Sequence, residues 1–328
     1  MSLRRTAVRG AILLLVAAGV LFAQSCGGSS DTPSFPKVVS LGSGDIFPTI
    51  LNSGLAVGQN RISMAITDRD DNKVLGATVH LRYYNLTGSS PKLLITTDAR
   101  FIPIELSYID EQANHERSPV GSDGAYVSYA DFDAAGDWGV EITITRDGKK
   151  LKPVLFRFNV VAHSTEPAIG DPAPPSVQQT LATAASIDDI DSSYPPRPGM
   201  HDMTVADALK TGEPIVIAFA TPAFCRSRTC SPVMDTVMDP LAAKYGGRAV
   251  FIHIEPYVLR DVREDNVQNP VPATLEWRIS TEPWIFVVDR QGRIVGKFEG
   301  IVAADEVESV LSLALETAPA AVSPVPTG

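Results

Sequence analysis

Residues 214–230 read PIVIAFATPAFCRSRTC, an apolar run followed by two closely spaced cysteines. The run from Pro214 to Ala220 has the length and composition of a buried strand. Beyond Cys225 and Cys230, apolar residues between Ser231 and Tyr245 recur at helical spacing, which predicts a helix. The cysteine pair therefore lies where a buried strand passes into a helix, and it is the leading candidate for chemistry in this chain.

The rest of the C-terminal region, residues 201–316, alternates between predicted helices and strands. Helices are predicted over residues 204–210, 231–245, 272–279 and 304–315, and strands over 214–220, 249–254, 284–288 and 294–298. This order gives a first helix, a strand–helix–strand unit with a crossover, and a final strand–strand–helix unit. It predicts a layered α/β domain.

Two stretches of this region resemble the thioredoxin-like superfamily, especially its membrane-tethered bacterial members. They are residues 219–230, FATPAFCRSRTC, and residues 281–300, TEPWIFVVDRQGRIVGKFEG. The resemblance implies a thioredoxin-like domain. Within it, Cys225 matches the attacking cysteine, Cys230 the resolving cysteine and Pro283 a cis-proline that faces the disulfide.

The residues around Cys225 favour a reactive thiol on independent grounds. A thiol at a helix N-terminus meets the positive end of the helix dipole, and Arg226 and Arg228 add positive charge, so we expect the thiolate to form near neutral pH. The negative charge of Glu282 would oppose formation of the Cys225 thiolate if this side chain faces the sulfurs. It would also be placed to accept a proton when Cys230 attacks a mixed disulfide, with a solvent-facing carboxylate as the alternative.

The spacing of the cysteines departs from the thioredoxin pattern, because four residues separate Cys225 from Cys230 where thioredoxins have two. Five helical steps advance about 7.5 Å along the axis, which exceeds the roughly 7 Å Cα separation that a disulfide tolerates. The pair therefore cannot bond while the whole segment is helical. Either Cys225 lies in a loop ahead of a helix that starts near Cys230, or the first turn unwinds on oxidation and rewinds on reduction.

Three other functions stay open for the pair. Q-type peroxiredoxins share its spacing, but they place a threonine and a proline where this chain has Pro222 and Phe219. Copper chaperones of the Sco type supply a histidine from a loop, whereas residues 255–283 contain none and His253 lies in a predicted strand as an expected core residue. The third alternative is a non-catalytic interaction module with a structural disulfide. We expect no metal and no cofactor.

The N-terminus predicts export and attachment to a membrane. Residues 1–26 combine a basic start, an apolar run over residues 11–23 and Cys26. The run is too short for a permanent membrane-spanning helix but suits an export signal. It resembles a bacterial lipoprotein signal, which implies that Cys26 receives lipid and that residues 27–37 form a flexible tether. Of the three cysteines, only Cys225 and Cys230 then remain to pair, as expected in an oxidising compartment.

Residues 38–162 are predicted to form an all-β domain. Short strands are expected over residues 60–67, 77–86, 93–97, 125–129, 138–146 and 153–161, with turn-forming clusters between them. Regular short strands without helices predict an immunoglobulin-like sandwich. Residues 132–144, FDAAGDWGVEITI, resemble the late strands of exported domains of the YtkA and FixH kind. No candidate enzyme site occurs in this domain.

Residues 163–200 are rich in proline, alanine, serine and aspartate and are predicted as a semi-rigid linker that buries little, so the two domains are expected to be separable. Residues 317–328 are predicted as a disordered tail. The formal net charge of −10 argues against nucleic acid as a partner. The sequence thus predicts a multidomain, membrane-tethered, extracytoplasmic thiol-disulfide oxidoreductase. Its expected partners are exported protein thiols and disulfides and a membrane electron donor or acceptor.

Overall fold

The structure is a computed structural model that describes residues 33–35, 46–110 and 116–318. These residues belong to one compact unit, which begins at Pro33. The predicted signal over residues 1–26, with Cys26, lies outside the described residues, as do most of the predicted tether and tail. Within the described ranges, no helix has the length and apolar character needed to cross a membrane.

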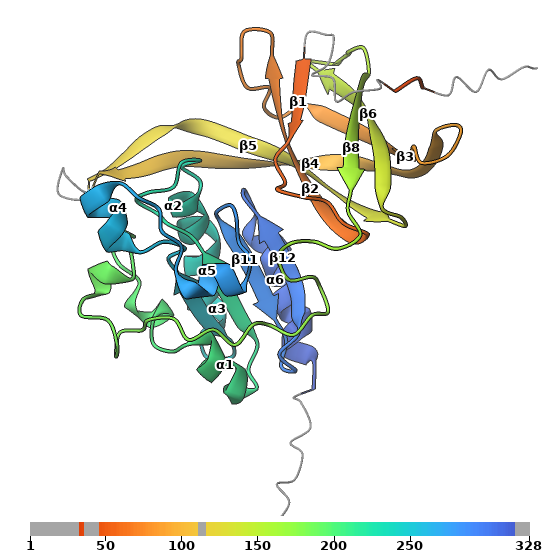
Figure 1. The fold of residues 1–328 in the computed structure, drawn as a ribbon. Helices are drawn as coiled ribbons and strands as arrows, with labels where there is room; N and C mark the ends of the chain where they lie inside the picture. Colours follow the sequence, from red (N-terminus) through yellow and green to blue (C-terminus); the bar gives the residue numbers. More distant parts are fainter. Residues whose placement is uncertain (1–32, 36–45, 111–115, 319–328) are drawn as a thin grey trace, which may run out of the picture. The chain divides into compact units, whose positions relative to one another are not determined.

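The first part of the described chain is a curled β-sheet (Figure 1). Its strands are β1 (Ile46–Ile50), β2 (Gly58–Asp68), β3 (Thr78–Asn85), β4 (Lys92–Asp110), β5 (Glu116–Phe132), β6 (Gly136–Arg146), β7 (Lys149–Lys150) and β8 (Val154–Val160). They pair in the order β1-β2-β5-β4-β3-β6-β7, and β8 also pairs with β6. Hydrogen bonds thus join them into one sheet, which differs from the two separate sheets of the predicted immunoglobulin-like sandwich.

Strands β4 and β5 are much longer than the sequence predicts, and they explain this continuity. Residues 92–99 of β4 pair with β3, whereas residues 100–110 pair with residues 116–127 of β5. We call residues 100–110 and 116–127 the arm. It lies beside helix α2 (Cys230–Val233) (Figure 1). Ile102, Ile104 and Leu106 alternate with exposed residues along the arm and are buried in one hydrophobic cluster with the C-terminal part. The two parts are therefore not the separable modules that we expected.

The second part of the described chain has the α/β arrangement predicted for a thioredoxin-like domain. Its four strands are β9 (Ile215–Phe219), β10 (Val250–Ile254), β11 (Trp284–Val288) and β12 (Ile294–Glu299), in the order β10-β9-β11-β12. Strands β9 and β10 are parallel, and β11 is antiparallel to both β9 and β12. The strand positions agree with the sequence prediction to within a residue or two.

The helices of this part are α1 (Val205–Thr211), α2 (Cys230–Val233), α3 (Asp239–Tyr245), α4 (Leu259–Asp265), α5 (Pro272–Glu276) and α6 (Ala304–Glu316). A π-helical stretch, η3 (Met234–Met238), joins α2 to α3, so residues 230–245 form one continuous helix. Thr204 caps α1 as predicted, because its hydroxyl accepts a hydrogen bond from the Asp207 N–H at 3.0 Å. Helix α4 was not predicted.

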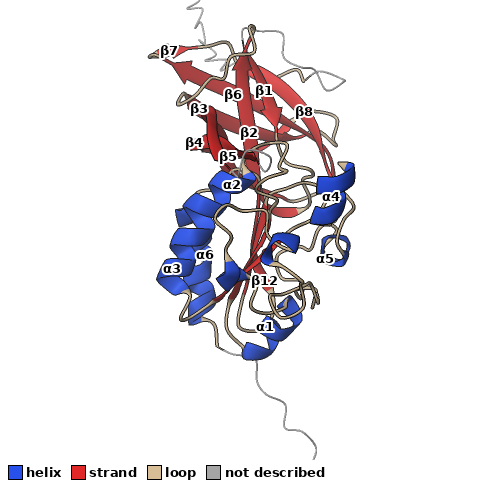
Figure 2. Ribbon diagram, turned by 90° about the vertical axis from the view of Figure 1, so that its left-hand side faces the viewer, coloured by secondary structure: helices blue, strands red, loops and turns tan. Residues whose placement is uncertain are grey.

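Helices cover both faces of the four-stranded sheet (Figure 2). On one face, α3 and α6 pack on a cluster that includes Val216, Ala218 and Ile285. On the other face, α1 and α5 pack on a cluster that includes Ile217 and Phe286. Because successive side chains of a strand point to opposite faces, this arrangement explains why β9 is apolar at every position.

Residues 163–200 pack against the second part of the fold, so the prediction that they bury little is wrong. Gly170 donates a backbone hydrogen bond to the Ile294 carbonyl at 2.8 Å, and the Ile294 N–H donates to the Asp171 carbonyl at 2.9 Å. Further along, Asp191 is buried and accepts hydrogen bonds from the N–H groups of Ser193 and Arg197. Such side-chain bonds satisfy backbone groups that no neighbouring strand can pair.

Candidate functional site

Three segments meet at one end of the four-stranded sheet. The parallel strands β9 and β10 end side by side, with Phe219 opposite Ile254. Strand β11 begins opposite the same residue, with Trp284 paired to Phe219. The loop after β9, the residues after β10 and the residues before β11 therefore leave the sheet together. These segments carry the two cysteines, Tyr257 and the dipeptide Glu282-Pro283.

Cys225 and Cys230 form a disulfide in the loop after β9, with their Cα atoms 6.0 Å apart. Cys225 precedes the helix, and Cys230 is the first residue of α2. In the oxidised protein Cys225 therefore lies outside the helix, as both alternatives that the spacing left open require, and the two differ only in the reduced protein. In the turn between them, the Arg228 N–H donates to the Cys225 carbonyl at 3.1 Å. Arg228 has a φ of 59°, a left-handed conformation that costs a non-glycine residue about 1–2 kcal/mol.

The sulfur of Cys225 lies among hydrogen-bond donors. The backbone N–H of Cys230 donates to it at 3.3 Å, and the Ser227 hydroxyl lies 3.1 Å away. The Ser227 hydroxyl also contacts the Thr229 hydroxyl at 2.7 Å, which holds it beside the sulfur. After reduction, these donors favour the thiolate of Cys225, because hydrogen bonds to a charged form stabilise it.

Glu282 and Pro283 lie at the start of β11. The Glu282–Pro283 peptide bond is cis, and Pro283 is buried. The Tyr257 hydroxyl donates a hydrogen bond to Glu282 Oε2 at 2.7 Å. Burial raises the pKa of Glu282, and the Tyr257 hydrogen bond and the charge of Arg226 partly oppose that rise. Because Arg226 stands between the cysteines, its charge couples the cysteine loop to Glu282.

The arm packs over the cysteine loop. Its residue Tyr108 has the Arg228 guanidinium 5.8 Å from the ring centre, and its residue Leu106 shares a hydrophobic cluster with both cysteines. Cys230 is fully buried, and Cys225 is only 8% exposed. Cys225 is therefore the more exposed of the two cysteines, and the arm contacts the loop that carries it.

Loosening the arm is expected to speed exchange with large partners. The double variant Tyr108→Ala/Arg117→Ala removes the contact with Arg228 and the ion pair between Arg117 and Asp235 of the helix. Each contact contributes about 0.5–1 kcal/mol, so we expect a roughly fivefold faster reaction with a reduced protein and little change with dithiothreitol. Stopped-flow measurement of the rates of disulfide reduction checks this.

The control for this variant is Arg82→Ala, which removes a similar contact with Tyr84 in the curled sheet, where Arg82 lies 5.4 Å from the ring centre. It should leave both rates unchanged. Equal acceleration with dithiothreitol and with protein would show that the arm does not select partners by size.

A buried polar cluster lies beside the cysteine loop, and the sequence does not predict it. Asp191, His201 and His253 are at most 3% exposed, and their side-chain oxygen and nitrogen atoms approach within 4.8 Å of one another. The Ala223 N–H donates to the hydroxyl of Ser192 at 3.1 Å, which ties the cluster to the loop. No spacing pattern joins these residues, since each comes from a different segment and Asp191 lies in the predicted linker.

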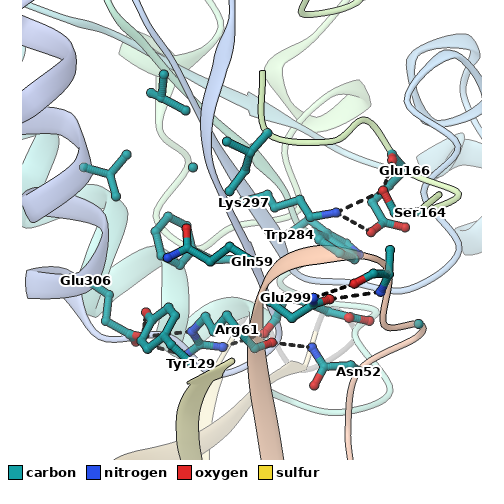
Figure 3. A pocket seen from close by; sticks show the side chains of 18 of the residues that line it. Asn52, Gln59, Arg61, Tyr129, Ser164, Glu166, Trp284, Lys297, Glu299 and Glu306 are labelled. Carbon is teal, nitrogen blue, oxygen red and sulfur yellow. Dashed lines mark hydrogen bonds and ion pairs between the residues drawn. The ribbon is translucent and has the colours of Figure 1, made fainter. Parts of the chain in front are cut away.

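A cavity of about 210 Å³ lies where the curled sheet meets β12 and α6 (Figure 3). Its charged groups bind one another: Arg61 forms an ion pair with Glu306, and Lys297 forms one with Glu166. Glu299 accepts hydrogen bonds from the Ser53 N–H and from the Thr281 hydroxyl. These contacts hold the two parts of the fold together, and we assign the cavity no chemical role.

No protein-family model matches the sequence, and no curated protein matches it. Nine chains of solved structures match. One, a thiol:disulfide interchange protein DsbE from Chlorobium tepidum, is 17% identical over 45% of this chain and 98% of that one, with a TM-score of 0.29. Another, the soluble domain of PmoD from Methylocystis sp., is 16% identical over 37% of this chain and 95% of that one, with a TM-score of 0.19.

Proposed function

We propose that this protein is an extracytoplasmic thiol-disulfide oxidoreductase that uses the Cys225–Cys230 pair. The observation that carries the proposal is the place of the disulfide. It lies between β9 and the helix that starts at Cys230, at the sheet end where Pro283 directly precedes β11. Its partners would be exported protein thiols and disulfides, together with a membrane electron donor or acceptor.

The order of the exchange steps follows from the exposure of the two cysteines, of which Cys225 is the more exposed. A thiolate of the partner attacks Cys225 Sγ, the Cys225–Cys230 bond breaks, and Cys230 leaves as a thiolate that takes up a proton. A second thiolate of the partner then attacks the partner's own sulfur in the mixed disulfide and releases the Cys225 thiolate. Two electrons pass to the pair in all, and one proton is bound by Cys230 while Cys225 remains a thiolate. In the reverse direction, Cys225 attacks a partner disulfide and Cys230 resolves the intermediate.

A turnover assay tests this function. The full chain, cycled with a dithiol or a disulfide reagent, should reduce or oxidise a disulfide-containing protein faster than the reagent alone. If the rate with the full chain equals the rate with the reagent, the protein is no exchange catalyst. The burial of Cys230 would then favour the alternative of a structural disulfide in an interaction module.

We propose Glu282 as the proton acceptor for Cys230 during resolution. Only the carboxylate accepts a proton, and burial raises the pKa of Glu282 above its ordinary value. The resolution rate should therefore fall as the pH drops through this raised pKa. In Glu282→Gln this acid limb should vanish and the rate above it should fall by about 100-fold, as for loss of a general base. Quenched-flow trapping of the mixed disulfide across the pH range measures both.

Two variants give this test its specificity. In Tyr257→Phe, loss of the hydrogen bond that lowers the pKa of Glu282 should move the acid limb to higher pH. Glu264→Gln removes an exposed carboxylate from α4 and should change nothing. An acid limb that survives in Glu282→Gln would assign the proton transfer to another group.

We propose that lipid on Cys26 holds the protein at the outer face of a membrane, with residues 27–37 as the tether. The support is the sequence of the N-terminal signal, and the predicted boundaries of the signal, residues 1–26, and of the tether, residues 27–37, belong to the same proposal. Release of the protein from membranes in Cys26→Ala is the expected result. Continued membrane association of that variant would argue for an uncleaved anchor.

A further inference from the structure

Asp191, His201 and His253 have the separations of ligands around one ion. Nε2 of His201 lies 3.2 Å from Asp191 Oδ2, and Nδ1 of His253 lies 3.5 Å from Asp191 Oδ1. Ligands held at about 2.0–2.2 Å from a metal are neighbours at roughly 3.0–3.5 Å from one another. The potential ligand atoms all lie within 4.8 Å of one another, so an ion would draw the two rings slightly together.

The hydrogen bonding of His253 leaves one nitrogen free. Nε2 lies 2.9 Å from the Ala220 carbonyl oxygen, which can only accept, so Nε2 carries the proton. In the neutral ring with its proton on Nε2, Nδ1 holds a bare lone pair. That lone pair faces the Asp191 carboxylate, a second acceptor. A histidine that donates one N–H to a carbonyl and offers its other nitrogen is oriented as metal ligands are.

The surroundings leave this nitrogen and its counterpart on His201 unsatisfied. Among the described residues, neither His253 Nδ1 nor His201 Nε2 has a hydrogen-bond partner, although both side chains are at most 2% exposed. Buried polar atoms without partners are costly. Both rings also line a cavity of about 510 Å³, together with Glu255 and Tyr257, which gives an ion a route of entry.

The charges around the site permit a cation. Arg197 lies close enough to affect Asp191, but its guanidinium is paired with Asp235 and Asp239 of the helix. The Asp191 carboxylate lies buried beside both histidine rings and supplies negative charge for a cation. The N–H groups of Ser193 and Arg197 fix its orientation at 2.8 Å and 2.6 Å.

We propose that Asp191, His201 and His253 bind one divalent transition-metal ion through a carboxylate oxygen, Nε2 and Nδ1, respectively. Two imidazoles and one carboxylate suit Zn²⁺, whereas Ca²⁺ and Mg²⁺ take oxygen ligands. The ion would fasten the segment before α1 to β10, next to the loop that carries Cys225. The site goes beyond the thiol-disulfide function and uses neither cysteine.

Calorimetric titration of the oxidised full chain with Zn²⁺ tests the site. The expected result is one ion bound per chain, a higher melting temperature with Zn²⁺, and no binding of Ca²⁺. Asp191→Asn and His253→Gln should each weaken Zn²⁺ binding by at least about 100-fold, since each removes a ligand. The double variant Cys225→Ser/Cys230→Ser should bind Zn²⁺ as the unchanged protein does, which separates this site from the redox pair.

The matched control is His80→Gln, because His80 is an exposed histidine paired with Asp98 in the curled sheet. It should bind Zn²⁺ normally. X-ray absorption of the zinc-loaded unchanged protein gives a second readout that does not depend on folding of the variants, and it should show nitrogen and oxygen ligands. The proposal is overturned if the unchanged protein binds no Zn²⁺, if sulfur lies in the metal shell, or if His80→Gln abolishes binding.

Discussion

Replacing Cys225 by serine is expected to reduce thiol-disulfide exchange by roughly three orders of magnitude or more, because the hydroxyl is no match for a thiolate as nucleophile. Cys225 is the more exposed of the two cysteines, whereas Cys230 is fully buried. Cys230→Ser should therefore behave differently. It should still attack a partner disulfide through Cys225 but should not resolve, so that a mixed disulfide accumulates. Non-reducing electrophoresis and mass spectrometry of the trapped species check both results.

The third cysteine provides the control. Cys26→Ser leaves the pair intact and should retain full exchange activity when assayed in solution. If Cys225→Ser traps the mixed disulfide and Cys230→Ser does not, the roles of the two cysteines are reversed. If neither variant forms one and exchange continues, the pair is not the reactive centre.

Arg61→Met is expected to destabilise the protein by about 3–5 kcal/mol, the cost of leaving a buried charge unpaired. Arg61 donates two hydrogen bonds to Glu306, at 2.8 Å and 2.9 Å, and another to the Ile301 carbonyl at 2.7 Å (Figure 3). Both side chains are at most 7% exposed. The change leaves the Glu306 carboxylate without its cation at the contact between the curled sheet and α6. Urea denaturation gives the free energy of unfolding.

A neighbouring ion pair offers a matched control for this prediction. Arg100 pairs with Asp305, the residue before Glu306, at 2.6 Å, but the two side chains are 57% and 61% exposed. Arg100→Met should cost no more than about 1 kcal/mol, as is usual for exposed pairs. The double variant Arg61→Met/Glu306→Gln should recover much of the loss, because no charge is left unpaired. Equal costs for Arg61→Met and Arg100→Met would contradict the structural role given to Arg61.

The four-stranded sheet could be predicted from the sequence because its signals are local. Each of its strands is a short apolar run, and the helix after Cys230 shows its own periodicity. Helix α4 gave no such signal, since only Leu259 and Val262 of its residues are buried and the rest are mostly charged. A helix this short is held by its packing rather than by its propensity.

The arm was missed because it carries residues that usually interrupt strands. Pro103 lies within β4, where a proline argues against a central strand. Among the described strands, residues 100–110 pair with β5 alone, so no second strand of the described chain needs an N–H from Pro103 and the proline is tolerated. Glycine is common in turns, so Gly124 also argues against a strand at its position in β5. The structure nevertheless requires a glycine there, because a Cβ would meet the ring of Phe101.

The positions of the cysteine pair and of Pro283 at one end of the sheet could be predicted from the sequence, because each lies beside a strand that the sequence also predicts. The Asp191, His201 and His253 cluster could not, because only the packing of residues 163–200 against the second part brings Asp191 to β10. A stretch with proline and small polar residues gives no sign of this. Its burial depends on side-chain hydrogen bonds, which have no periodicity.

The reduction potential of the Cys225–Cys230 pair tests the central claim most directly. The full chain is equilibrated with glutathione or dithiothreitol buffers, and the fraction of reduced pair is read by thiol alkylation and mass spectrometry. A pair that exchanges with partners should have a potential well above about −300 mV, so that glutathione reduces it measurably. A potential below that value, with no reduction by glutathione, would show that the disulfide only staples its loop and would contradict the proposed function.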